Sequence, residues 1–178
     1  MTERQPVKAR RPRRATAAYL ERVALFLLGR QSTTSARLRR ALQRRVDRSA
    51  RAHGTDAAEG RALAEALVER LTRVGLLDDA RFARDRAESL LGRGTSPRAI
   101  AYKLKALGVE PAEIQAALGA LRASESDPEL AAAIALARRR RLGPYATAKR
   151  QSGRELAVLV RAGFSFSVAK RVLEGPVV

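Results

Sequence analysis

The stretch Leu27-Leu28-Gly29-Arg30 (LLGR) returns 63 residues later as Leu90-Leu91-Gly92-Arg93. The segment after each copy stays in register at an offset of 62 residues, so that Thr33, Thr34, Leu38 and Leu42 correspond to Thr95, Ser96, Ile100 and Leu104. Self-similarity of this kind is typical of stacked supersecondary units that share a core. Because the period exceeds that of two-helix repeats, we predict three helices per unit, with Leu142-Gly143 marking a degraded third copy.

The apolar residues from Thr16 onward are spaced three or four apart, and no stretch alternates with a period of two, which predicts an all-α fold. Only seven aromatic residues are present, as in cores of closely packed aliphatic helices. Cap chemistry predicts helix starts at Asp127-Pro128, Ser96-Pro97 and Glu110-Pro111, and helix ends at Gly108 and Gly163. We expect about nine helices in total.

Residues 1–15 carry six basic residues, one Glu and two Pro with no apolar period, which predicts a disordered basic N-terminal tail. Three-helix repeats are then expected at 16–77, 78–124 and 125–178.

The formal net charge is +18, from 36 Lys and Arg against 18 Asp and Glu. Such a field favours a polyanionic partner and opposes self-association, so we expect a monomer that binds nucleic acid or a nucleoprotein. A solvated helix face explains any single Arg, but not the collective excess. With few aromatics for base stacking, contacts to phosphates or an acidic protein surface are expected. The candidate contact residues are Arg37, Arg40, Arg44, Lys103, Arg138, Arg139, Arg140 and Arg141.

Few residues could carry catalysis. The chain has no Cys and a single His53, in a polar stretch typical of a helix end, which argues against a zinc site or a Ser/His triad. The turn at residues 92–97 lacks the ending of a phosphate loop, and we interpret it as a plain turn before a capped helix. The apolar run Val23–Leu28 is too short to span a bilayer. We therefore expect a soluble cytoplasmic protein that is not an enzyme and uses no cofactor or metal.

The paired carboxylates of Gly75-Leu76-Leu77-Asp78-Asp79-Ala80-Arg81-Phe82-Ala83 admit three interpretations: metal ligands, a general acid or a helix start. No further carboxylates are spaced to complete a coordination sphere. We therefore predict that Asp78 caps a helix whose first turn holds Asp79, that Leu76 and Leu77 turn into the core, and that Phe82 lies on the buried face.

This stretch and three later segments together resemble the RecX family, the regulators of the RecA recombinase. The later segments are Gly94-Thr95-Ser96-Pro97-Arg98-Ala99-Ile100, Leu104-Lys105-Ala106-Leu107-Gly108-Val109 and Arg161-Ala162-Gly163-Phe164-Ser165. The resemblance covers roughly residues 18–173 and is strongest in the middle third. It departs at Arg44 to Glu59, which is longer and more polar than the family's usual link between the second and third helices.

The resemblance implies a fold of three tandem three-helix repeats in an elongated, curved array. It also implies a protein that binds RecA filaments on DNA, with single- or double-stranded DNA within or beside the filament contributing. Such a protein restrains RecA ATPase activity, strand exchange and the co-protease activity that triggers the SOS response. A different class, a free-standing basic helical protein that binds DNA or RNA, stays open as an alternative.

Overall fold

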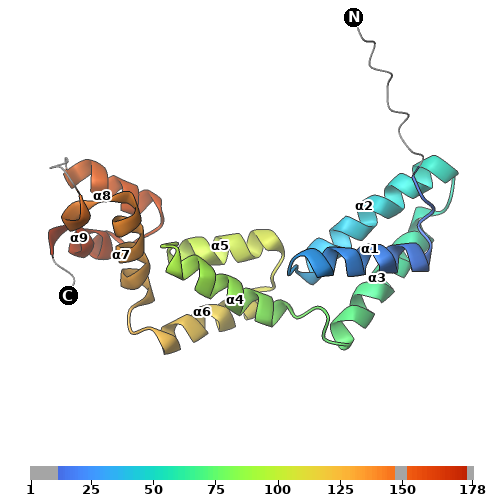
Figure 1. Cartoon of the computed structure of the whole chain (residues 1–178), viewed down its shortest axis with the longest axis horizontal. Helices are drawn as coiled ribbons and strands as arrows, with labels where there is room; N and C mark the ends of the chain where they lie inside the picture. Colours follow the sequence, from blue (N-terminus) through green and yellow to red (C-terminus); the bar gives the residue numbers. More distant parts are fainter. Residues whose placement is uncertain (1–11, 147–151, 176–178) are drawn as a thin grey trace, which may run out of the picture. The chain divides into compact units, whose positions relative to one another are not determined.

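A computed structural model describes residues 12–146 and 152–175, and all regular structure in these residues is helical (Figure 1). The elements are α1 (Ala17–Arg30), α2 (Ser35–His53), α3 (Ala57–Arg73), α4 (Asp79–Gly92), α5 (Pro97–Leu107), α6 (Pro111–Ser124), α7 (Pro128–Arg140), the 3-10 turn η1 (Gly143–Tyr145), α8 (Ser152–Arg161) and α9 (Phe166–Glu174). The predicted all-α fold of three-helix repeats is confirmed. The chain divides into two compact units between Leu77 and Asp78.

The first unit packs α1, α2 and α3 around one aliphatic core. Leu20 of α1, Leu42 of α2 and Val68 of α3 are almost fully buried in it. The helices α2 and α3 approach closely where Gly60 faces Val46, because a Cβ at residue 60 would lie 2.6 Å from Val46 Cγ1. A stripe of small and aliphatic residues thus forms the core of this unit, as the low aromatic content predicts.

Residues 12–15, assigned from the sequence to the tail, contact α2. The amide of Ala15 donates to Ser49 Oγ at 2.9 Å, and Nε2 of His53 lies 2.7 Å from the carbonyl oxygen of Pro12. His53 is the last residue of α2, as its polar surroundings predict. Its side chain contacts the segment that precedes α1. The rest of the predicted tail, residues 1–11, lies outside the described residues.

The second unit contains α4 to α9 around two adjoining cores. One core lies among α4, α5 and α6 and includes Ile100 and Leu104, and the other includes Leu136 and Leu159 of the last helices. Leu91 packs against both cores. The buried positions confirm the internal repeat, because Ile100 and Leu104 occupy the positions that Leu38 and Leu42 occupy in the first unit.

The turn between α4 and α5 is packed against α7 and against the turn that follows α8. Gly94 has a φ of 74°, and a Cβ there would lie 2.5 Å from the amide nitrogen of Leu136. Ser96 is fully buried, and its Oγ donates to the carbonyl oxygen of Ala162 at 2.8 Å while it accepts from the amide of Ala99. The interpretation of residues 92–97 as a structural turn rather than a phosphate loop is therefore confirmed.

Local cap chemistry sets most helix boundaries. Oδ1 of Asp78 accepts from the amide of Arg81 at 2.8 Å, and Oδ1 of Asp127 accepts from the amide of Leu130 at 3.0 Å. Both are the predicted helix starts, and a side chain that accepts an orphan amide of the first turn explains why they are aspartates. The helix-start interpretation of the paired carboxylates is thus confirmed for Asp78.

One part of that prediction is wrong. Leu77 is buried, but Leu76 is 54% exposed, because the turn that follows α3 points adjacent residues in opposite directions. The amides of both leucines donate to the carbonyl oxygen of Leu71, and only the side chain of Leu77 enters the core. Phe82 is half-buried and packs against the core of the second unit.

Candidate functional site

A stripe of five exposed arginines runs along α2. Three of them are the candidates from the sequence, Arg37, Arg40 and Arg44. Arg48 and Arg51 follow on the same helix, and the five are spaced at steps of three or four residues. Residues at these steps share one face of an α-helix. The stripe covers about 21 Å of helix axis, from 1.5 Å of rise per residue, and we call it the α2 arginine stripe.

No ion pair neutralises the charges of the α2 arginine stripe within residues 12–77. Asp47, the only carboxylate in the sequence of α2, pairs with Arg61 of α3 at 2.8 Å. Within the described residues no carboxylate lies within ion-pair distance of the stripe, and only Arg40 donates to a carbonyl of its own helix, that of Ala36. Five guanidinium groups therefore remain for an external anion.

The remaining ion pairs of this unit lie off the stripe. Arg39 binds Glu65 of α3 in a bidentate manner at 2.6 and 2.7 Å, and these hydrogen bonds lower the pKa of Glu65. Arg70 of α3 pairs with Glu21 of α1 at 2.7 Å. The basic residues of the first unit thus divide into those that tie helices together and those of the stripe.

The other predicted contact residues lie in the second unit. Lys103 is exposed on α5. The run Arg138 to Arg141 forms the C-terminal end of α7, where positive charge interacts favourably with the helix dipole. Its first two members are engaged within the unit, since Arg138 lies over the ring of Tyr145 and Arg139 donates to the carbonyl oxygen of Arg93 at 2.6 Å.

Arg140 and Arg141 are exposed, and Arg141 ends α7 in the left-handed conformation at φ 56°. All four arginines of the run are thus exposed, and the first two also make contacts within the unit.

Sequence reasoning missed Arg48 and Arg51 as members of the stripe. The family resemblance implies a link between helices within Arg44 to Glu59, whereas α2 extends through His53 and leaves only residues 54–56 outside a helix. The signal that could have found them is helical spacing: Val46 and Ser49, both buried, continue the apolar face opposite the arginines.

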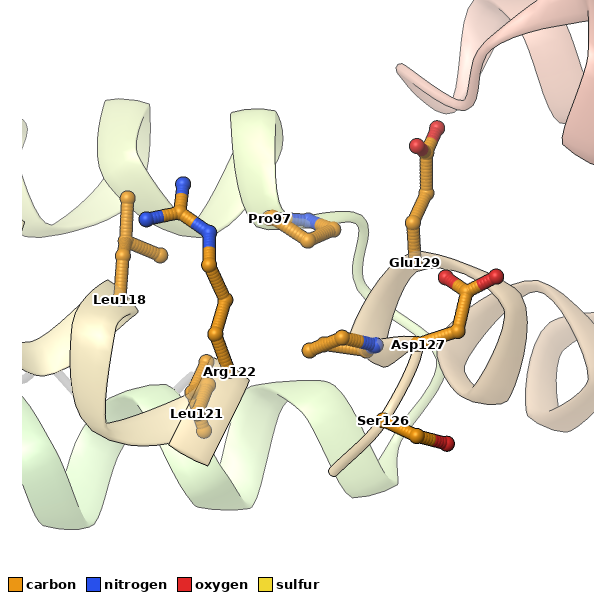
Figure 2. A pocket seen from close by; sticks show the side chains of 8 residues that line it. Pro97, Leu118, Leu121, Arg122, Ser126, Asp127 and Glu129 are labelled. Carbon is orange, nitrogen blue, oxygen red and sulfur yellow. The ribbon is translucent and has the colours of Figure 1, made fainter. Parts of the chain in front are cut away.

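The second unit also holds a cavity of about 350 Å³ beside the start of α7 (Figure 2). It is lined by Pro97, Leu118, Leu121, Arg122, Ser126, Asp127, Pro128 and Glu129. Its carboxylates already have partners, because Asp127 caps α7 and pairs with Arg171 at 3.7 Å, and Glu129 accepts from the amide of Ser165. Figure 2 shows Glu129 extending away from Leu118 and Leu121. The carboxylates that line the cavity thus connect the start of α7 to Ser165 and Arg171.

Within residues 12–146 and 152–175, no three His, Cys, Asp or Glu residues come together in a way that could hold a metal ion. No helix in that same part of the chain is long and apolar enough to cross a membrane.

Fold and charge together define a class: basic all-α proteins built from tandem three-helix units. Comparison with known proteins narrows this class. Residues 78–118, which form α4, α5 and the start of α6, match the model of the second three-helix domain of RecX.

Three relatives share the name Regulatory protein RecX. The protein of Myxococcus xanthus is 46% identical over 169 residues, which are 93% of this chain and 89% of that protein. The protein of Agrobacterium fabrum is 30% identical over 84% of this chain and 79% of its own length. The protein of Thermobifida fusca is 33% identical over 85% and 75%. This chain belongs to the RecX family of regulatory proteins.

Proposed function

We propose that this chain is a negative regulator of RecA. It binds RecA nucleoprotein filaments and inhibits RecA ATPase activity, strand exchange and co-protease activity, and so modulates recombination and the SOS response. Membership in the RecX family supports the target. The observation that supports the binding mode is the α2 arginine stripe, a row of five exposed guanidinium groups that form no ion pair with any described residue.

The chemistry of the stripe matches a filament built on DNA. Guanidinium groups bind phosphates and carboxylates in a bidentate manner, and both groups are present where DNA lies in a protein filament. The stripe is about 21 Å long, which is the length of about six base pairs of B-form DNA. Arg140, Arg141 and Lys103 supply further cations on the second unit. The protein acts as a monomer in the cytoplasm, without a catalytic residue, cofactor or metal.

Inhibition sets a thermodynamic condition. A ligand that binds two states of a filament equally shifts neither, so the protein must bind the inhibited or disassembling filament more tightly than the active one. A tenfold preference corresponds to about 1.4 kcal/mol of differential binding.

The test is the DNA-dependent ATPase of RecA, measured on preformed filaments with increasing amounts of this protein. We expect the rate to fall as this protein is added up to one copy per RecA, and light scattering distinguishes a filament that disassembles from one that is only slowed. An unchanged rate at stoichiometric amounts would contradict the proposal.

The alternative is a free-standing nucleic-acid-binding protein, because the stripe would bind phosphates without any help from RecA. Binding to RecA in the absence of DNA separates the two functions. Tight binding to naked duplex, together with no binding to RecA and no effect on its ATPase, would favour the alternative.

A further inference from the structure

The most exposed aromatic side chain in the described part of the chain is Tyr102 of α5, at 76%. Tyr19 and Tyr145 are both half-buried, and Tyr145 is covered by the guanidinium of Arg138 at 5.3 Å. Phe26 on α1 likewise has the guanidinium of Arg30 at 5.6 Å from its ring centroid. Among the described residues, no such cation lies over the ring of Tyr102.

Two cations share the helix face of Tyr102. Arg98 precedes it by four residues and Lys105 follows it by three, and both are exposed. These spacings place the three side chains on one face of α5. The sequence of α5 contains no Asp or Glu, and the described residues place no carboxylate within ion-pair distance of either cation.

The internal repeat shows that this face differs chemically from the equivalent face of α2. At the offset of 62 residues, Tyr102 stands where the first unit has Arg40, and Lys105 stands where it has Gln43. Arg98 corresponds to Ala36, so the equivalent positions of α2 carry a single exposed cation, Arg40, whereas α5 carries an exposed aromatic ring between two exposed cations. A ring between cations suits a ligand that offers both a flat apolar face and flanking negative charges.

We infer that the face of α5 formed by Arg98, Tyr102 and Lys105 binds single-stranded nucleic acid, with Tyr102 stacked on a base and the two cations on neighbouring phosphates. Base faces are accessible in a single strand but stacked inside a duplex. An acidic protein surface would pair with the two cations but would leave the ring without a matching contact. The inference rests on the proposed function in one respect, which is that the nucleic acid is taken to be DNA.

The test measures binding of the full-length protein to a fluorescein-labelled oligothymidine by fluorescence anisotropy, without RecA. Stacking of one base on an aromatic side chain is worth about 1–3 kcal/mol, so Tyr102→Ala is expected to weaken binding by about fivefold to 140-fold. Tyr102→Phe, which keeps the ring, should bind as the wild type does. On an abasic strand of the same length, Tyr102→Ala should have no effect.

Two matched controls separate this face from the general positive charge. Phe166→Ala removes another exposed aromatic, at 62%, and should leave oligothymidine binding unchanged. Lys105→Ala and Lys103→Ala remove the same charge from α5, but Lys103 lies about 100° around the helix from Tyr102, so Lys105→Ala should cost more affinity. Equal binding of Tyr102→Ala and wild type, or equal loss with Phe166→Ala, overturns the inference.

The result is independent of the proposed function. If the wild-type protein leaves the RecA ATPase unchanged, regulation of RecA fails, yet the oligothymidine measurements still decide the role of Tyr102. If the wild-type protein inhibits RecA and Tyr102→Ala binds oligothymidine normally, only the inference fails. Because Tyr102 packs against nothing in the core, its replacement should leave the thermal unfolding midpoint unchanged, and circular dichroism checks this.

Discussion

The two adjacent aspartates Asp78 and Asp79 have a local structural role. Asp78 Oδ1 accepts from the amide of Arg81, so Asp78→Ala should lower the free energy of unfolding by about 1 kcal/mol through loss of a helix cap. Asp78→Asn should cost much less, because Asn caps a helix about as well as Asp. Urea denaturation measures both. The folded Asp78→Ala protein should still inhibit the RecA ATPase, and a selective loss of inhibition at full stability would show that Asp78 has a functional role.

Glu113, at the start of α6, lies in an environment that disfavours the charged form of its carboxyl group. Burial raises its pKa, and the charges of Asp79, Glu110 and Asp78 raise it further, against a hydrogen bond from the amide of Glu110 that lowers it. A raised folded-state pKa means that the native state holds the proton more tightly, so stability falls as the pH rises through this pKa.

Glu113→Gln should therefore raise the free energy of unfolding at pH 7, but by no more than about 0.5 kcal/mol because solvent screens the charge of this partly exposed side chain. The amide oxygen of Gln can still accept from the amide of Glu110. Below pH 4, where the carboxyl is protonated in both states, the variant and the wild type should be equally stable. Urea denaturation at the two pH values tests this, and an equal gain at both would contradict the electrostatic explanation.

At the scale of the element, the sequence predicts helix starts better than helix lengths. Ser96 and Asp127 could be identified as caps because a cap depends on residues within one turn. The extent of α2 could not, because its second half presents few apolar residues and its burial depends on α3, where Gly60 approaches Val46. The arginine stripe was therefore predicted only as far as Arg44.

The stripe of α2 allows a prediction about charge placement. Arg44→Ala with Arg48→Ala removes two unpaired cations, and each lost phosphate contact should reduce the slope of log K against log salt by about 0.9. The slope for duplex DNA should thus flatten by about 1.8 units. The double variant Arg61→Ala with Arg70→Ala removes the same charge from residues that are paired with Asp47 and Glu21, and it should change the slope much less. Equal flattening would assign binding to the overall field of the protein.

At the scale of the whole molecule, the division into repeats followed from the sequence, whereas the contacts that join repeats did not. The LLGR copies and the register of the following helix identify the repeat because they are local patterns. Burial of Ser96 against Ala162 depends on how α8 and α9 pack, and no local pattern encodes it. The same holds for the hydrogen bond that Arg139, a predicted contact residue, donates to the carbonyl oxygen of Arg93.

Gly94 offers a direct test of this junction. A Cβ at residue 94 would lie 2.5 Å from the amide nitrogen and 2.8 Å from the Cα of Leu136, both backbone atoms, and φ is 74°. Overpacking against backbone and the cost of a left-handed conformation for Ala together predict a loss of about 3 kcal/mol for Gly94→Ala. Hydrogen exchange should show this loss in α4 to α9, because every close contact of Gly94 lies in that unit.

The matched control lies two residues away. Gly92, the last residue of α4, has no atom within 4 Å of its Cβ position and no positive φ, so Gly92→Ala should leave protection in α4 to α9 unchanged or raise it by up to about 1 kcal/mol. The difference between the two variants isolates the contact with α7 from the general effect of replacing a glycine in this turn. Similar protection in both variants would mean that the turn does not hold the second and third repeats together.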